Sequence, residues 1–391
     1  MELLSPAGDF ERLIAAVTYG ADAVYLAGKE FGMRASQTNF DNEQMTKAVE
    51  YAHKNNVKVY VTCNILPRND EIEYIPAYLK FLYEIGVDAV IASDIGMLSL
   101  IKEHTPQMEV HISTQAGVVN YQTAKAFYEM GAKRVVLARE LSLEEISEIC
   151  HKVPVDIEVF VHGAMCMSFS GRCLISNYLT SRDANHGECA QPCRWGYHLV
   201  EEKRPNEFYP VFEDEKGSYI LNAKDLCMIE YIDKLKEAGV KSLKIEGRAK
   251  SSYYVSVVTN AYRMAMDNGF EPWLLDEVKK VSHRRYSTGF YFDTPTQYYE
   301  NGGYIREYDV VALVDEYKDG FLYCTQKNKF SLNDMVEILQ PHEKPFDFKI
   351  TELYDENGNE IDSACHAMMK LKIKCDINIK KGSIIRKNKV N

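Results

Sequence analysis

Short apolar runs alternate with amphipathic segments from residue 1 to about residue 265. The runs have the length of buried strands, and the segments between them repeat apolar residues at steps of three and four, as helices do. The predicted strands are 1–7, 22–28, 57–64, 87–93, 108–115, 133–140, 155–163 and 241–247. The predicted helices include 10–20, 42–56, 72–86, 121–131, 143–153, 228–239 and 252–269, with Cys227 at the start of the sixth.

A glycine ends four of these helices directly before the next strand, at Gly20, Gly86, Gly131 and Gly239. Glycine at this place permits a left-handed helix end and a short turn into a buried strand. The recurrence indicates an internal strand–helix repeat. Eight such units predict an α/β fold, a (β/α)8 TIM-like barrel; a doubly wound open sheet is the alternative.

A different pattern begins near Val310, where short alternating strands are separated by Gly, Asn and Asp turns. This pattern is typical of a small β-barrel. We therefore expect a barrel domain at 1–270 with a cysteine-rich insertion at 163–227, a linker or hairpin region at 271–308, and a small C-terminal β-barrel domain at 309–391.

Composition narrows the class of protein. The chain is 46% hydrophobic and 26% charged, as soluble globular proteins are. Its first residues lack a leader pattern and no run approaches 18 apolar residues, so we expect a cytoplasmic protein without a membrane partner. A net charge of -11 argues against bulk electrostatic coating of nucleic acid, but leaves room for a local basic site.

Half of the ten cysteines lie in one stretch directly after the seventh predicted strand. Thiolates this close in sequence usually share a soft metal or an Fe–S cluster, and disulfides are rare in a reducing compartment. The uneven spacing favours an Fe–S cluster over a zinc knuckle, although zinc remains the alternative. The five are Cys166, Cys173, Cys189, Cys193 and Cys227, so one is spare in a four-thiolate site.

Other polar residues are expected at the carboxyl ends of the barrel strands, where such barrels carry their active sites. His162, Glu246 and Arg248 are the predicted catalytic residues, although a structural histidine and a simple Glu246–Arg248 pair are open alternatives. Arginines suit an anionic substrate, and the basic, aromatic segment 282–292 suits single-stranded RNA or a packed hairpin. The predicted substrate-binding residues are Gln115, Arg172, Arg182, Arg194, Arg284 and Arg285.

Residues 158–176 follow without departure the signature E-x-F-x2-G-[SA]-[LIVM]-C-x4-G-x-C-x-[LIVM]-S of the collagenase-like proteins filed as peptidase family U32. The opening ELLSPAGDFERL, the later RDANHGECAQPCRW and KIEGR are also similar to that family, so the resemblance spans nearly the whole chain. Members include proteins of tRNA uridine, ribosomal RNA cytidine and ubiquinone hydroxylation. Length and the C-terminal β domain make the chain most similar to the tRNA-modifying members.

The resemblance implies oxygen-independent formation of 5-hydroxyuridine at a tRNA wobble position, with prephenate or a similar dicarboxylate as hydroxyl donor. It implies a [4Fe–4S] cluster on Cys166, Cys173, Cys189 and Cys227, with Cys193 as the alternative ligand. An electron donor or a family paralogue is a further expected partner. Two other functions stay open: a U32-type peptidase and a zinc-stabilised RNA-binding protein.

Overall fold

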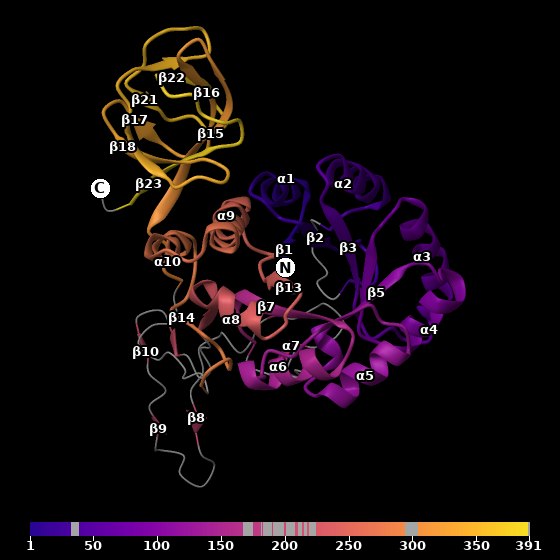
Figure 1. Cartoon of the computed structure of the whole chain (residues 1–391). Coiled ribbons are helices and arrows are strands. Elements are labelled where there is room, and N and C mark those ends of the chain that lie inside the picture. Colours follow the sequence, from indigo (N-terminus) through magenta and orange to yellow (C-terminus); the bar gives the residue numbers. More distant parts are fainter. Residues whose placement is uncertain are drawn as a thin grey trace.

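The computed structural model describes residues 1–32, 39–166, 175–180, 224–293 and 304–389, residues 182 and 190, and four two-residue strands between 199 and 218. Those strands are β8 (Leu199–Val200), β9 (Phe208–Tyr209), β10 (Glu213–Asp214) and β11 (Gly217–Ser218). Two folded units make up the described chain: a large one of strands and helices and a smaller one of strands (Figure 1).

Eight parallel strands close into a barrel surrounded by helices (Figure 1), which confirms the predicted fold class. Each strand pairs with the next, and the last pairs with both the first and the seventh, which closes the sheet. The strands are β1 (Glu2–Pro6), β2 (Ala23–Leu26), β3 (Lys58–Cys63), β4 (Ala89–Ala92), β5 (Glu109–Ile112), β6 (Arg134–Val136), β7 (Asp156–Ala164) and β13 (Ser242–Ile245).

Local sequence explains where the helices begin and end. Asp41 with Gln44 and Ser142 with Glu145 form capping boxes at two helix starts. The four glycines predicted after helices all have positive φ, from 86° to 99°. No helix in the described residues is long and apolar enough to cross a membrane. The helices are α1 (Phe10–Thr18), α2 (Asn42–Lys54), α3 (Ile75–Glu84), α4 (Ile95–His104), α5 (Tyr121–Glu129), α6 (Leu143–Lys152), α7 (Ile175–Thr180), α8 (Ile232–Glu237), α9 (Ser252–Asn268) and α10 (Pro272–Lys279).

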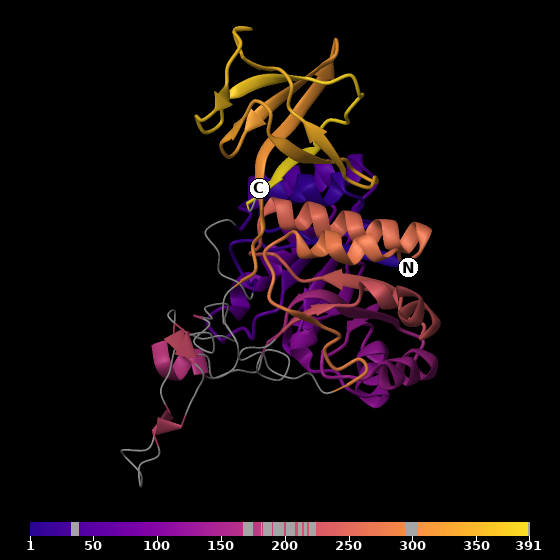
Figure 2. The same ribbon diagram turned by 90° about the vertical axis from the view of Figure 1, so that its left-hand side faces the viewer.

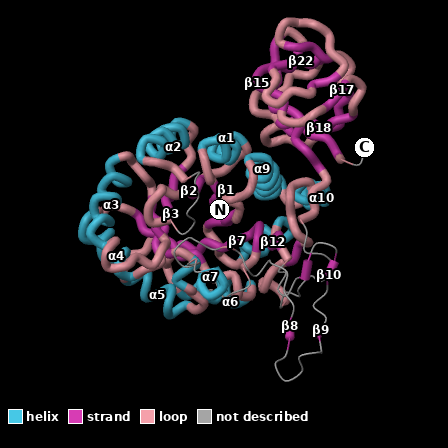
Figure 3. Tube along the Cα trace, turned by 180° about the vertical axis from the view of Figure 1, so that it is seen from behind, coloured by secondary structure: helices cyan, strands magenta, loops and turns pink. Residues whose placement is uncertain are grey.

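Strand β7 is nine residues long and extends beyond its barrel neighbours, so its end can pair with a further strand. Strand β12 (Asp225–Cys227) lies antiparallel to it (Figure 3). Strand β14 (Tyr286–Ser287) pairs in turn with β12. The expectation that Cys227 begins a helix is therefore wrong. Main-chain pairing with β7 holds this residue in a strand, opposite His162.

The C-terminal unit is a curved, seven-stranded antiparallel sheet with a hydrophobic core of its own. The expected small β domain is thereby confirmed. Its strand order is β19–β18–β23–β15–β16–β22–β20. The strands are β15 (Tyr308–Lys318), β16 (Phe321–Gln326), β18 (Met335–Leu339), β19 (Phe346–Lys349), β20 (Leu353–Asp355), β22 (Lys370–Lys374) and β23 (Ile384–Asn388), beside a separate pair β17 (Phe330–Ser331) and β21 (Ser363–Ala364).

The C-terminal domain sits over α9 and α10 of the barrel domain (Figure 2). Leu339 and Ile384 belong to the hydrophobic core of the barrel domain, although both come from the C-terminal sheet. The hydroxyl of Tyr19 on the barrel side donates to the carbonyl oxygens of Leu339 and Gly382, at 3.3 and 3.1 Å. The contact is thus both apolar and hydrogen-bonded, and it fixes the two domains to each other.

Candidate active site at the barrel mouth

A cavity of about 110 Å³ opens at the carboxyl ends of the barrel strands. Three of the residues predicted to act in catalysis or substrate binding line it, namely Gln115, Glu246 and Arg248. This end of a (β/α)8 barrel is where such folds place their active sites. The other lining residues are Tyr25, Thr62, Asn64, Ile91, Ser113, Thr114, Arg139, Phe160 and Lys244.

The end of β13 and the residues that follow it supply the charged side of the cavity. Lys244 lies in β13, whereas Glu246 and Arg248 follow the end of this strand. All three are at least nine-tenths buried. The guanidinium of Arg248 donates to the hydroxyl of Thr62 and to the side-chain oxygen of Asn39, each at 3.2 Å. These contacts hold Arg248 across the mouth from β13 toward β3.

A buried ion-pair network forms the floor below the cavity. The ammonium of Lys244 lies 2.8 Å from Glu158, and Arg134 lies 3.1 Å from the other oxygen of that carboxylate. Arg134 also pairs with Glu2, which accepts a hydrogen bond from Tyr60 at 2.7 Å. Burial raises the pKa of Glu158, but Lys244 and Arg134 outweigh it and lower the pKa to about 2. The floor is therefore charged but locally balanced.

Arg139 connects the cavity to the segment that carries the cysteines. Its guanidinium lies 3.8 Å from the centre of the Phe160 ring and donates to the carbonyl oxygen of Ala164 at 2.7 Å. Ala164 is the last residue of β7, and Cys166 follows two residues later with an exposed side chain. The cavity and the first predicted cluster ligand therefore lie at the same end of β7.

Cys166 and Cys227 are the members of the predicted ligand set that the structure describes; Cys173, Cys189 and Cys193 lie outside the described residues. Cys227 is buried and faces the hydroxyl of Tyr262 at 4.0 Å. Burial raises the pKa of its thiol to about 12. Thiol donors suit an Fe–S cluster, and metal binding would deprotonate them.

Cys227 lies in β12, opposite His162 of β7, whereas Cys166 follows the end of β7, four residues after His162 in the sequence. Within the described residues no group of three or more His, Cys, Asp and Glu side chains is arranged to hold a metal. Cys166 and Cys227 both offer thiol sulfurs, which is the donor chemistry that an Fe–S cluster needs. The complete ligand set stays a prediction.

His162 lies outside the cavity. Its ring packs against Tyr254, Tyr262 and Tyr286, with centroids 5.1 to 6.0 Å away, and its Nε2 is 3.3 Å from the Tyr286 hydroxyl. A β-bulge at Val161 pairs Ile245 with His162 and turns the imidazole outward, toward α9. Burial lowers its pKa to about 3, so the ring is neutral. A catalytic role for His162 stays a prediction that this placement does not support.

The predicted substrate-binding arginines are dispersed. Arg284 is buried in an ion pair with Asp225 at 2.9 Å and joins β14 to β12, while Arg285 and Arg182 are exposed. None of these three lines the mouth cavity. Arg172 and Arg194 lie outside the described residues.

Sequence reasoning did not select Lys244 or Phe160 as site residues. The signal was present, because Lys244 and Glu246 are two positions apart in a predicted strand and Phe160 is two positions from Glu158. Residues two apart in a strand share a face, so one inward residue identifies the other. Phe160 forms an apolar wall, and Lys244 adds a cation at the cavity floor.

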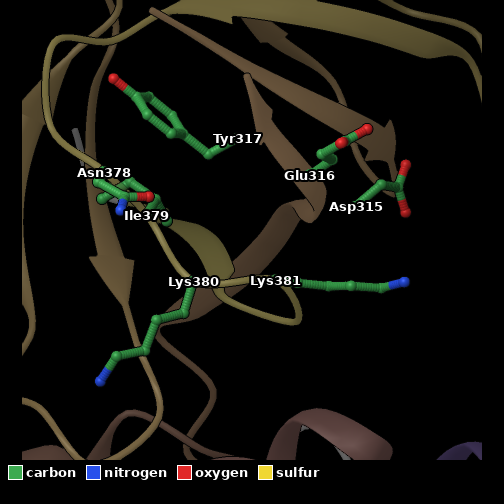
Figure 4. Close-up of a pocket in the computed structure, with 7 residues that line it drawn as sticks. All are labelled: Asp315, Glu316, Tyr317, Asn378, Ile379, Lys380 and Lys381. Carbon is green, nitrogen blue, oxygen red and sulfur yellow. The ribbon is translucent and has the colours of Figure 1, made fainter. Parts of the chain in front are cut away.

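A larger hollow of about 500 Å³ lies in the C-terminal domain, between β15 and the loop that precedes β23. Asp315, Glu316, Lys380 and Lys381 line it, and the side chains of the two lysines diverge (Figure 4). None of the residues predicted to act in catalysis or binding is among its lining residues. The barrel mouth is therefore the better candidate site.

The whole chain matches known proteins. The profile of peptidase family U32 matches residues 8–301, and that of the peptidase family U32 C-terminal domain matches residues 306–386. A relative from Bacillus subtilis, named tRNA hydroxylation protein P1, is 39% identical over 99% of this chain and 95% of its own. The tRNA hydroxylation protein P of Escherichia coli is 39% identical over 87% of this chain and 86% of its own.

A third relative covers a smaller part. The 23S rRNA 5-hydroxycytidine C2501 synthase of Escherichia coli is 39% identical over 68% of this chain, but only 39% of its own length is covered. The two family profiles together span both the barrel domain and the C-terminal sheet. The chain belongs to peptidase family U32.

Proposed function

We propose that this protein is an enzyme that hydroxylates RNA without dioxygen, converting a wobble uridine of tRNA to 5-hydroxyuridine with prephenate as hydroxyl donor. The observation that carries the proposal is the cationic cavity at the barrel mouth, at the same end of β7 as Cys166. Relatives named for tRNA and ribosomal RNA hydroxylation, similar over much of the chain, support the reaction class.

The cavity suits a carboxylate-bearing donor. Arg139 and Arg248 present guanidinium groups, which match carboxylates bidentately, and Gln115 adds an amide. Small-molecule sites usually enclose about 300–1,000 Å³. At about 110 Å³ the cavity holds only part of a molecule of prephenate's size. The rest of the donor would extend out of the mouth, toward the RNA.

The net reaction balances without another oxidant. Donor–OH and RNA–H give donor–H and RNA–OH, so C5 of the uridine loses two electrons and the donor carbon gains two. Glu246 is the one carboxylate among the described lining residues, and it is placed to accept and return a proton during this exchange. Phe160 and Tyr25 exclude water from one side of the cavity. An external electron donor or a paralogous partner is not needed for the balance and stays a prediction.

A [4Fe–4S] cluster would be held by Cys166, Cys173, Cys189 and Cys227, with Cys193 as the alternative. When bound, such a cluster would supply one-electron redox chemistry. Arg139 would orient the ligand-bearing segment through its hydrogen bond to Ala164. Zinc is the alternative metal for the same thiols.

Two measurements test the proposal. Protein purified without oxygen should be coloured and contain iron and sulfide in equal amounts; a colourless protein after anaerobic reconstitution contradicts the cluster. Nucleosides from tRNA of a strain lacking the gene should lose 5-hydroxyuridine and its derivatives, and unchanged levels in a strain without a paralogue contradict the RNA substrate. Peptide hydrolysis has less support, because no histidine is among the described residues that line the mouth.

A further inference from the structure

A third cavity, of about 630 Å³, lies between the barrel domain and the C-terminal domain. Its walls are α1, the start of α9 with the turn before it, Arg306 in the connection between the domains, strands β15 and β23, and the residues that follow β16. We propose that this interdomain cleft binds the sugar–phosphate backbone of the RNA beside the nucleotide that enters the barrel mouth. The inference rests on the proposed function and specifies where its RNA is held.

Three cations from three parts of the chain line the cleft. Lys250 comes from the barrel, Arg306 from the connection and Lys327 from the C-terminal sheet. Among the described residues, none of the three has a carboxylate within ion-pair distance. The ammonium of Lys250 donates to the carbonyl oxygen of Ser282 at 3.2 Å and lies 4.1 Å from the Tyr304 ring centre. Their charges are therefore available to an anionic ligand.

The two carboxylates that line the cleft already have partners. Glu11 accepts a hydrogen bond from Ser252 at 2.9 Å, and Asp309 lies 3.4 Å from the ammonium of Lys389. The described lining carries three cations against these two carboxylates, a net charge of +1, in a chain whose net charge is -11. This local positive charge favours a polyanionic ligand such as RNA. Contacts between basic side chains and phosphates position nucleic acids on proteins.

The remaining walls suit ribose and base surfaces. Ile14 is 41% exposed, which is high for an aliphatic side chain, and Val310 and Tyr308 are half-buried beside it. Cations from separate segments around a wide, partly apolar cleft match an extended strand better than a compact dicarboxylate. Because the domains are joined by Tyr19 and by shared apolar residues, the cleft is formed before any ligand binds.

The cleft adjoins the barrel mouth through one turn. Arg248 lines the mouth and Lys250 lines the cleft, with only Ala249 between them. The amide of Lys250 donates to the carbonyl oxygen of Gly247 at 2.8 Å, and Arg12 donates to the Lys250 carbonyl oxygen, so the turn is fixed. A strand held in the cleft is thus adjacent to the site where its neighbouring nucleotide reacts.

The test removes the two cleft cations that make no hydrogen bond or ion pair in the described structure. Binding of tRNA, purified from a strain lacking the gene, is measured by filter binding over a salt series with the full chain and with Arg306→Ala/Lys327→Ala. Each lost phosphate contact removes about 0.7–0.9 from the salt slope. We expect a slope smaller by about 1.5, an affinity lower by roughly tenfold or more near physiological salt, a higher KM for tRNA and an unchanged kcat.

A matched control removes the same charge elsewhere. Lys318→Ala/Lys372→Ala acts on the outer face of the C-terminal sheet, where neither lysine has a carboxylate partner among the described residues. This variant should bind tRNA within about twofold of the unaltered protein. Arg306→Lys/Lys327→Arg should restore binding, which separates charge from misfolding.

Three results overturn the inference. Equal weakening by both double variants would mean that only overall charge matters. Unchanged tRNA binding and modification in Arg306→Ala/Lys327→Ala would remove the cleft from RNA recognition while leaving the proposed function intact. An unaltered protein that neither binds nor modifies tRNA would instead overturn the proposed function, and this inference with it.

Discussion

Arg386 of the C-terminal sheet donates to both oxygens of Glu277 on α10, at 2.6 and 2.7 Å, and both side chains are almost completely buried. Arg386 also pairs with Glu337 at 2.7 Å, and Lys280 approaches the same carboxylate. A buried charge without its partner is costly, so the pair holds the two domains in one arrangement.

Glu277→Ala should lower the free energy of unfolding by about 3–5 kcal/mol, because it leaves the guanidinium of Arg386 without its main partner. Chemical denaturation followed by circular dichroism measures the change. Asp276→Ala on the same helix is the control, since its exposed pair with Lys279 contributes at most about 1 kcal/mol. Equal effects of the two variants would show that the buried pair does not stabilise the domain contact.

Glu158→Gln should alter the acid stability of the barrel. The native pKa of about 2 lies below the unfolded value of about 4.3, so ionised Glu158 stabilises the fold above pH 4.3 and loses this effect as pH falls toward 2. The shift corresponds to about 3 kcal/mol at neutral pH. Unfolding midpoints between pH 7 and pH 2 should show a weaker pH dependence in the variant. The exposed Glu148→Gln should follow the unaltered protein.

Arg248→Ala should raise the KM for the small-molecule donor by roughly tenfold or more, because a charge-assisted hydrogen bond contributes about 1.5–3 kcal/mol. Steady-state kinetics with the donor varied and tRNA in excess measures it. Arg285→Ala provides the comparison, because this arginine is exposed and does not line the cavity. A donor KM that responds to Arg285 and not to Arg248 would move the donor site away from the barrel mouth.

Cys189→Ser should abolish the cluster, whereas Cys193→Ser should retain iron and sulfide. Anaerobic iron and sulfide assays with absorption spectra compare the two proteins. Cys365→Ser is the matched control, since this thiol is exposed on the C-terminal domain, far along the chain from the other candidates. Loss of the cluster from the Cys193 variant alone would exchange the two assignments.

Periodicity was sufficient to predict the barrel, because strands buried on both faces and helices that end in Gly20, Gly86, Gly131 and Gly239 leave strong local signals. Gln115, Glu246 and Arg248 were likewise selected from their positions at the ends of predicted strands, and all three line the mouth cavity. The bulge at Val161 has no such signal, since it depends on how β7 pairs with β13, and it turns His162 away from the cavity.

Contacts between residues distant in sequence also explain why two other predictions differ from the structure. Arg284 was selected as a binding residue from its basic, aromatic surroundings, but Asp225, 59 residues earlier in the chain, neutralises it. Cys227 was predicted to begin the helix that follows it, but main-chain pairing with the end of β7 places it in strand β12. In each case the partner is distant in sequence, so no local pattern could reveal it.

Arg248 and Lys250 face two different compartments from one short, immobilised turn. Their α-carbons can be separated by at most about 7 Å along the backbone. An RNA strand bound in the interdomain cleft on one side of this turn therefore spans only a short, fixed distance to the barrel mouth on the other side. The nucleotide that reacts is then selected by its distance along the RNA strand from the phosphate bound in the cleft. Insertion of one residue between Arg248 and Lys250 would change which nucleotide reaches the barrel mouth.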